Sequence, residues 1–285
     1  MTATQGRRGA RIATLVAGGL AAALLLVATT AGALVGLGAA DVSQRRAMLP
    51  DGVTAIEVHA EEVSINIIGT WGPSADRVPS VALRGVASSA LGRLPAVDIE
   101  LRGTTAIITP DETLRSLAFG PNSMDILLGD LALERIDVVT RGYVSIQHVD
   151  AVEIHATSLH SMVQVGGLPA TGLTLLEVAS NAGTQITLPE SGGPYDVQLP
   201  GWFGDDYVSE WWQAHYGLDY RTEVLGNAPS APIGADRVGE ELIAIPGAPT
   251  PTDGPGVFVP TTPGAPVTID LRGVTGGMLQ VLTHG

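Results

Sequence analysis

Three histidines and one glutamate in the middle of the chain are the residues best suited to bind a metal ion. His148, His155 and His160 are close in sequence, and Glu153 is two residues from His155. Residues two apart on a β-strand point to the same face, so Glu153 and His155 should project together. His148 has the parity of the apolar residues before it and should point to the buried face. The ligands then do not converge, and the sequence predicts no metal site and no cofactor.

The paired carboxylates of the chain are sequence neighbours, which is a poor arrangement for acid–base catalysis. Neighbours on a strand point to opposite faces, and the pairs are Glu61–Glu62, Asp205–Asp206 and Glu240–Glu241. The chain has no Cys and no Lys, which excludes thiol, Schiff-base and P-loop lysine chemistry. Nucleophile-elbow, metalloprotease and dinucleotide-binding motifs are absent from the sequence. We therefore predict that the protein is not an enzyme and has no catalytic residues.

Aromatic residues cluster after residue 200 and form the most distinctive candidate surface. The cluster comprises Trp202, Trp211, Trp212 and Tyr216. Exposed aromatics of this kind form interaction hot spots or stack on sugars. The same rings can instead be buried as a cap over the end of a β-stack, because stack ends need covering. Both readings, partner surface and cap, stay open at the level of sequence.

The elements that must position these residues are short β-strands. Apolar and polar residues alternate in many segments, as in Ile56 and Val58 against Glu57 and His59. Six such segments follow one another between residues 134 and 189: RIDVVT, GYVSIQH, AVEIHAT, HSMVQVG, LTLLEVA and GTQITLP. Short, evenly spaced strands suggest a sandwich, a barrel or a solenoid, and similarity between successive segments favours stacked rungs. We expect an all-β, β-solenoid-like stack.

The stretch MDILLGDLALERIDVVTRGYVSIQHVDAVEIHA resembles the bacterial putative-adhesin β-strand-repeat family, also called the toast-rack domain. The stretches GTQITLPESGGPYDVQLP and PVTIDLRGVTGGMLQVLTHG are similar to two further strand pairs of that family. The resemblance covers residues 53–200 and 267–285. It implies a membrane-linked or secreted β domain with no settled biochemical activity and no catalytic motif.

Residues 201–245 depart from the family pattern. Two aromatic pairs, Tyr207–Trp211 and Trp212–Tyr216, have the four-residue spacing of one helix face. We predict a short helix over residues 206–216 in this insert, with Asp205 as its N-cap and Gly217 as its stop.

A proline-rich run follows the insert over residues 246–266. Its repeated prolines predict an extended, semi-rigid strap. The strap leads to residues 267–285, which we expect to be the closing strand pair of the β domain at residues 53–200.

The N-terminus carries the features of a membrane span. Residues 12–40 contain no charged, amide or histidine side chain, and the run exceeds the about 20 residues that cross a bilayer. A secretory signal has a shorter apolar core, so we predict a retained transmembrane helix, with cleavage after Ala40 as the alternative. Basic residues before the span favour a cytoplasmic stub at residues 1–11 and an extracytoplasmic body after the juxtamembrane segment 41–52. Gly32 and Gly36 offer one helix-pairing spacing, so self-association through the span is a further option.

Charge narrows the choice of partners. The chain has a formal charge of −14, and every Asp and Glu follows residue 40. A body this acidic is unsuited to nucleic acid or to an anionic lipid surface.

We therefore expect a single-pass protein of the bacterial cell membrane whose body acts as a non-enzymatic, adhesin-like binding or scaffold module. Its partner would be an unidentified protein or a cell-wall polysaccharide. The alternative is a polysaccharide-binding or polysaccharide-active β-helix protein of the cell wall, and a third reading is a pure assembly protein that associates through the span.

Overall fold

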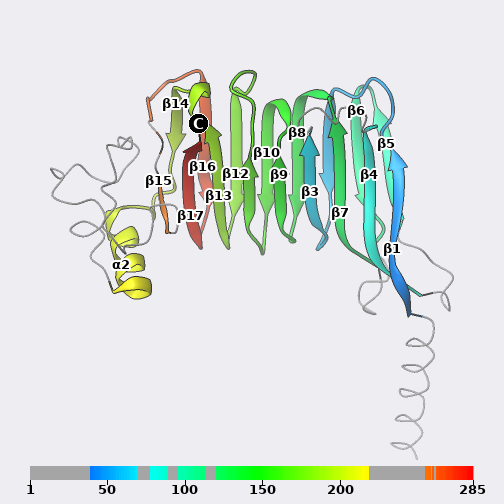
Figure 1. The fold of residues 1–285 in the computed structure, drawn as a ribbon, viewed down its shortest axis with the longest axis horizontal. Helices are drawn as coiled ribbons and strands as arrows, with labels where there is room; N and C mark the ends of the chain where they lie inside the picture. The colour runs from blue at the N-terminus through cyan, green and yellow to red at the C-terminus, as the bar shows by residue number, and fades with distance from the viewer. Residues whose placement is uncertain are drawn as a thin grey trace, which may run out of the picture.

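The computed structural model describes residues 39–69, 78–88, 96–112, 120–217, 254–257, 259 and 261–284. These residues form two large β-sheets, one α-helix and one short 3-10 helix (Figure 1). The prediction of an all-β body with a short helical insert is confirmed. Within the described ranges, no helix is long and apolar enough to cross a membrane. The predicted span at residues 12–40 lies outside those ranges, apart from Ala39 and Ala40, which begin a strand.

Nine strands form sheet A and eight form sheet B. In spatial order, sheet A contains β1 (Ala39–Met48), β4 (Ser80–Ser88), β7 (Gly120–Gly129), β3 (Ser64–Gly69), β9 (Val144–Gln147), β11 (Val163–Gly166), β13 (Gly183–Pro189), β17 (Met278–His284) and β15 (Gly256–Val257). Sheet B contains β14 (Tyr195–Gln198), β16 (Val267–Val274), β12 (Leu175–Ser180), β10 (Asp150–Ser158), β8 (Ala132–Thr140), β2 (Ala55–His59), β6 (Thr105–Pro110) and β5 (Val97–Arg102). The helices are η3 (Glu190–Gly192) and α2 (Asp205–Tyr216).

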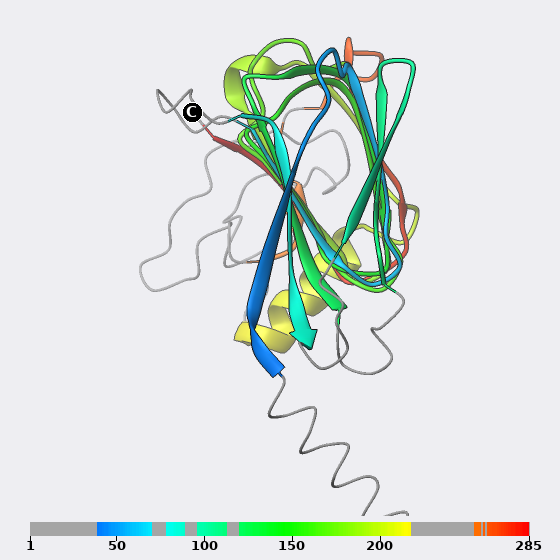
Figure 2. The same cartoon turned by 90° about the vertical axis from the view of Figure 1, so that its right-hand side faces the viewer.

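The chain alternates between the two sheets, so that consecutive strands form rungs. The strand pairs β8–β9, β10–β11 and β12–β13 stack in chain order, and their in-sheet neighbours pair in parallel. Figure 2 looks along this stack and shows the two sheets as two layers. All six segments predicted between residues 134 and 189 are strands of these three rungs.

Two rungs enter the stack out of chain order. The β2–β3 rung lies between β6–β7 and β8–β9, and the β16–β17 rung lies between β12–β13 and β14–β15. The predicted closing pair at residues 267–285 is therefore inserted before the last rung. Two antiparallel strands, β4 and β1, extend sheet A beyond this regular part, and β5 extends sheet B. Strand β1 occupies most of the segment expected to be juxtamembrane.

The hydrophobic core lies between the sheets and follows the alternation in the sequence. Ile56 and Val58 of β2 are fully buried, as are Ile65 and Ile67 of β3. Strand β5 departs from this pattern because it is an edge strand: Leu101 is 44% exposed. Burial of the apolar stripe on every inner strand is the main driving force for the stack.

A buried hydroxyl recurs at the same register where three successive strands of sheet B turn into sheet A. Thr140, Ser158 and Ser180 are partners across β8, β10 and β12, and each is 3% exposed or less. The Ser158 hydroxyl donates to the Gly142 carbonyl at 2.7 Å and accepts the Ser161 N–H at 3.0 Å. Such hydroxyls satisfy backbone groups of the turns, where the strand ladder ends.

Ala60 occupies the corresponding place after β2 and has no hydroxyl. Here the carboxylate of Glu112, from the segment after β6, accepts the backbone N–H groups of Glu61 and Glu62 at 2.7 and 3.0 Å. The Thr140 hydroxyl donates to the Val63 carbonyl in the same turn. A residue from a neighbouring rung thus replaces the missing local hydroxyl.

Helix α2 packs against the last rungs of the stack (Figure 1). It spans Asp205–Tyr216, close to the predicted bounds, and ends at Gly217 in the left-handed conformation, as predicted. The predicted N-cap is wrong, because the capping position is Gly204 and no side chain caps the helix. Gly204 precedes the first turn of the helix, and the ring of Phe203, the residue before it, is buried in the core.

Part of the predicted proline strap contributes to the fold. Gly256–Val257 forms β15 and pairs in parallel with β17. Thr261 bridges Tyr195 of β14, whose hydroxyl donates to the Pro189 carbonyl at 2.6 Å. Burial raises the pKa of the Tyr195 hydroxyl to about 12. The rest of the strap, residues 246–253, 258 and 260, lies outside the described residues.

Candidate functional site

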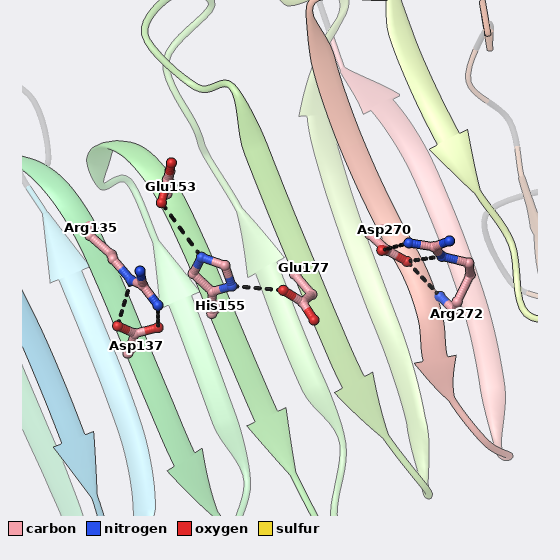
Figure 3. Close-up of polar contacts among 7 residues, drawn as sticks. All are labelled: Arg135, Asp137, Glu153, His155, Glu177, Asp270 and Arg272. Atoms are coloured by element: carbon pink, nitrogen blue, oxygen red, sulfur yellow. Dashed lines mark hydrogen bonds and ion pairs between the residues drawn. The ribbon is translucent and has the colours of Figure 1, made fainter. Parts of the chain in front are cut away.

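The outer face of sheet B carries a row of charged side chains, which we call the charged face. Four adjacent strands, β8, β10, β12 and β16, contribute to it (Figure 3). Its members are Arg135, Asp137, Glu153, His155, Glu177, Asp270 and Arg272. Four of them lie at one register, since Asp137 pairs with His155, His155 with Glu177, and Glu177 with Asp270.

Two bidentate ion pairs lie at the ends of the charged face. Arg135 Nε and Nη2 contact Asp137 Oδ2 and Oδ1 at 2.7 and 3.1 Å, and Arg272 Nε contacts Asp270 Oδ1 at 2.9 Å. The hydrogen bonds from Arg272 lower the pKa of the Asp270 carboxyl. The carboxylates in turn raise the pKa of each guanidinium. Within each pair the two residues are two apart on one strand, so they point to the same side.

His155 joins two strands at the centre of the charged face. Its Nδ1 lies 2.8 Å from Glu177 Oε2 on β12, and its Nε2 lies 3.7 Å from Glu153 Oε2 on β10 (Figure 3). Its side chain is only 23% exposed, whereas that of Glu177 is 54% exposed. Glu153 and His155 share a face, as predicted. The imidazole lies between the carboxylate of Glu153 on its own strand and that of Glu177 on the neighbouring strand.

These pairs reduce a repulsion between like charges that the strand register brings opposite each other. Glu177 faces Asp270 on the next strand, and Asp137 faces Glu57 on the other side. Directly opposed like charges destabilise a sheet. Arg135 and Arg272 pair with the aspartates on their own strands. Glu177 instead contacts His155 on the neighbouring strand. These partners offset the repulsion, although exposed pairs add little to stability.

The sequence carries a local signal for this face. An aliphatic residue separates opposite or complementary charges in Arg-Ile-Asp at 135–137, Glu-Ile-His at 153–155 and Asp-Leu-Arg at 270–272. The same triplet form occurs as Glu57-Val-His59 and Glu100-Leu-Arg102, and in each case the outer two residues pair. A charge–aliphatic–charge triplet therefore marks the outer face of each of these strands.

The other histidines weighed as metal-binding candidates do not lie beside His155. His148 adopts a left-handed backbone conformation in the β9–β10 turn, where its ring lies over Gly167. His160 is exposed in the β10–β11 turn. Among the described residues, no cluster of three His, Asp or Glu side chains has the geometry to hold a metal ion.

The four residues predicted as a partner surface differ in their exposure. Trp212 is fully buried against the core, and the Trp202 ring donates from Nε1 to the Val274 carbonyl at 2.7 Å. Trp211 is partly buried and stacks on His215 at a centroid distance of 4.0 Å. Only Tyr216, at 41% exposed, faces outward to a large extent. The cluster packs on the end of the stack, which is the arrangement expected of a cap.

One hollow of about 520 Å³ lies beyond the charged face, where β2, β6 and β8 end. Its lining includes His59, Thr109, Glu112 and the half-exposed Val139. The Glu112 carboxylate already accepts two backbone N–H groups of the β2–β3 turn, so this residue of the lining has a structural role.

Comparisons with known proteins define the chain only loosely. No protein-family model matches it, and no curated protein sequence matches it. A solved structure described as a "putative cell adhesion protein" from Clostridium sporogenes ATCC 15579 aligns with 86% of this chain and 100% of its own length. The identity is 8% and the TM-score is 0.44, and at this level the similarity supports no inference about function.

Proposed function

We propose that the protein is a non-enzymatic binding or scaffold protein of the bacterial envelope, tethered by residues 12–40 with its β body outside the cytoplasm. The observation that carries the binding role is the charged face. It presents seven charged or titratable side chains at fixed register on four adjacent strands (Figure 3).

The arrangement suits recognition better than catalysis. Each acid of the charged face is engaged by a neighbouring Arg or His on an open sheet surface. Catalytic carboxylates instead need raised or split pKa values, usually in a cleft. The pKa of Asp270 moves the other way, because Arg272 stabilises the charged form.

A surface with charges at fixed positions binds selectively to a partner whose charges have the matching spacing. Charged groups on a rim contribute mainly to association rate and specificity, and less to affinity. Because successive strands are about 4.8 Å apart, the charges repeat at a regular interval across the sheet. A protein partner with a matching row of opposite charges would dock in one register.

Charge reversal on this face tests the proposal. The double variant Arg135→Glu and Arg272→Glu should sharply reduce recovery of a co-purifying protein from detergent-solubilised, crosslinked membranes. Arg84→Glu is the matched control, because Arg84 also pairs with an aspartate, Asp125, but on sheet A. If the chain is recovered alone, or if the double variant and the control behave alike, the charged face is not the binding surface.

The polysaccharide alternative draws support from a different surface. This is the outer face of sheet A, where amide and hydroxyl side chains are aligned across adjacent strands.

A further inference from the structure

The charged residues of this acidic protein are unevenly divided between the two sheets. Four adjacent strands of sheet A, β3, β9, β11 and β13, contain no Asp, Glu, Arg or His. Their neighbours across the core, β2, β8, β10 and β12, each contain at least one acidic residue. In these four rungs the charged side chains therefore lie on sheet B, and the uncharged face of sheet A needs an explanation of its own.

Amide and hydroxyl side chains lie in one line across that uncharged face. We call this line the amide row, and its members are Asn66, Ser145, Gln164, Gln185 and Gln280. Each is the register partner of the next, from β3 through β9, β11 and β13 to β17. At about 4.8 Å per strand, the row is about 19 Å long, and its four members before the buried Gln280 cover about 14 Å of it.

Lateral hydrogen bonds hold the amide row in place. Gln185 Nε2 donates to Gln280 Oε1 at 3.0 Å, and Gln280 Nε2 donates to the Gly254 carbonyl at 2.8 Å. Asn66 Nδ2 donates to Asp125 Oδ1 at 2.8 Å, and Arg84 holds the same carboxylate. A primary amide can form about four hydrogen bonds, so one lateral bond orients Asn66, Gln164 or Gln185 without exhausting its capacity. Gln280 is only 1% exposed and makes two such bonds, so it braces the end of the row and does not face a ligand.

An aromatic ring lies beside the middle of the row. The hydroxyl of Tyr143, just before β9, donates to Gln164 Oε1 on β11. The ring is partly buried, and its position on the outer face is fixed at both ends, by the backbone and by this bond. Aromatic faces provide apolar contact area for the C–H groups of a ligand whose hydroxyls bind neighbouring amides.

From this geometry we infer that the amide row with Tyr143 is a binding site for a neutral, extended β-linked glycan. A sugar chain of this kind advances by roughly one strand spacing per unit, and its hydroxyls both donate and accept. The exposed amides and hydroxyl of the row can donate to and accept from those hydroxyls, and β3, β9, β11 and β13 offer no charged side chain to an ionic partner. This inference deepens the proposed envelope role, because it names a ligand for a second face of the same body.

A second copy of the chain is a poorer occupant of this face. Strands β9 and β11 are four residues long, so the uncharged region measures about 13 by 19 Å, or about 250 Å². A stable protein–protein interface needs about 800 Å² per partner. A narrow linear ligand fits the available area, and a protein face does not.

Oligosaccharide length provides the test. Full-length protein in detergent would be titrated with cellohexaose, chitohexaose and cellobiose by calorimetry. A hexamer should bind at least about ten times more tightly than the dimer, because it spans the row and the dimer spans two strands. The double variant Gln164→Ala and Gln185→Ala should weaken hexamer binding by about ten-fold or more. Thr157→Ala, on the outer side of sheet B and outside the charged face, is the control and should leave binding unchanged.

Three results would overturn the inference. The first is the absence of saturable binding of either hexamer up to ~1 mM. The second is hexamer binding by the Gln164→Ala and Gln185→Ala double variant that equals binding by the native protein, when the variant's melting temperature is unchanged. The third is a concentration-dependent self-association of the native protein that the same double variant abolishes. None of these results bears on the charged-face experiment, so the proposed function and the glycan site can fail separately.

Discussion

At the scale of single residues, the buried hydroxyls at the strand ends are the most repeated structural device. Ser158 is 1% exposed, and its hydroxyl donates to one turn carbonyl and accepts one turn N–H. We predict that Ser158→Ala lowers the free energy of unfolding by about 1–3 kcal/mol, because it removes both hydrogen bonds at a buried side-chain position. Denaturant unfolding checks this value.

The neighbouring Thr157 supplies the matched control. It precedes Ser158 on β10 and points to the outer face, where it is partly exposed. Thr157→Ala should change stability by no more than about 0.5 kcal/mol. Equal effects of the two substitutions would mean that the hydroxyl register is incidental.

The Asp270–Arg272 pair makes a pH-dependent contribution whose sign follows from the lowered pKa of Asp270. The folded state holds Asp270 ionised at pH values where the unfolded chain already begins to protonate it. The pair therefore stabilises the protein above the ordinary carboxyl pKa of 3.8, and this contribution is lost as pH falls through the lower folded value.

Arg272→Gln should remove that part of the acid sensitivity. Thermal unfolding measured between about pH 2 and pH 6 should show a smaller drop in melting temperature for the variant than for the native chain. The gain at neutral pH is small, because the Arg272 side chain is 67% exposed and solvent screens the pair. Parallel curves for the two proteins would contradict the assignment.

At the scale of elements, helix α2 acts as the cover of the last rungs. Trp212 is fully buried, and Gly254 lies so close that a Cβ there would fall 2.8 Å from the indole ring. Tyr207 adds a hydrogen bond from its hydroxyl to the Gly277 carbonyl at 2.6 Å. The helix is therefore joined to two other segments of the chain.

Truncation of Trp212 should destabilise the fold strongly. We predict that Trp212→Ala costs about 3–5 kcal/mol, the range for a buried Trp in a core. Trp211→Ala should also lower the melting temperature, by less, because this ring is only partly buried. Tyr216→Ala serves as the comparison, since Tyr216 is 41% exposed. If the three variants melt together with the native protein, the aromatic insert is not a cap.

Local sequence signals predicted those elements whose pattern is complete within the element. Alternation located β8 to β13, and the four-residue aromatic spacing located α2 with its Gly217 stop. The out-of-order β2–β3 and β16–β17 rungs could not be predicted, because strand order depends on contacts between segments far apart in sequence. Strand β1 was missed because AADVSQRRAM has little alternation and the preceding apolar run dominated its interpretation.

The same limit explains why the candidate sites could be predicted only in part from the sequence. The Arg135–Asp137 pair lies within one strand and is visible as a triplet, but the ladder from Asp137 through His155 to Glu177 requires the register of three strands. The amide row likewise joins Asn66 to Gln280 only through the complete order of sheet A. In both cases residue types were readable from the sequence and their alignment was not.

At the scale of the whole molecule, the start of the β body bears on how it would sit at a membrane. Strand β1 begins at Ala39, so the predicted span at residues 12–40 would lead into sheet A without a linker. Cleavage after Ala40 would remove only the first two residues of β1 and leave most of its pairing with β4. The fold is therefore compatible with both fates of the N-terminus, and only the length of the apolar run favours retention.

We predict that the N-terminal segment is retained and holds the protein in the membrane. After expression in a bacterial host, the full chain should sediment with membranes, resist extraction by high salt and dissolve in detergent, and its intact mass should include the residues before Asp41. Deletion of residues 12–38 is the matched control, because it leaves β1 whole. That variant should be soluble and melt within a few degrees of the full chain, since every core residue in the described part of the chain follows the deletion. A mature protein that begins at Asp41 and fractionates as soluble would exclude the anchor, and the two binding faces would then belong to a secreted protein.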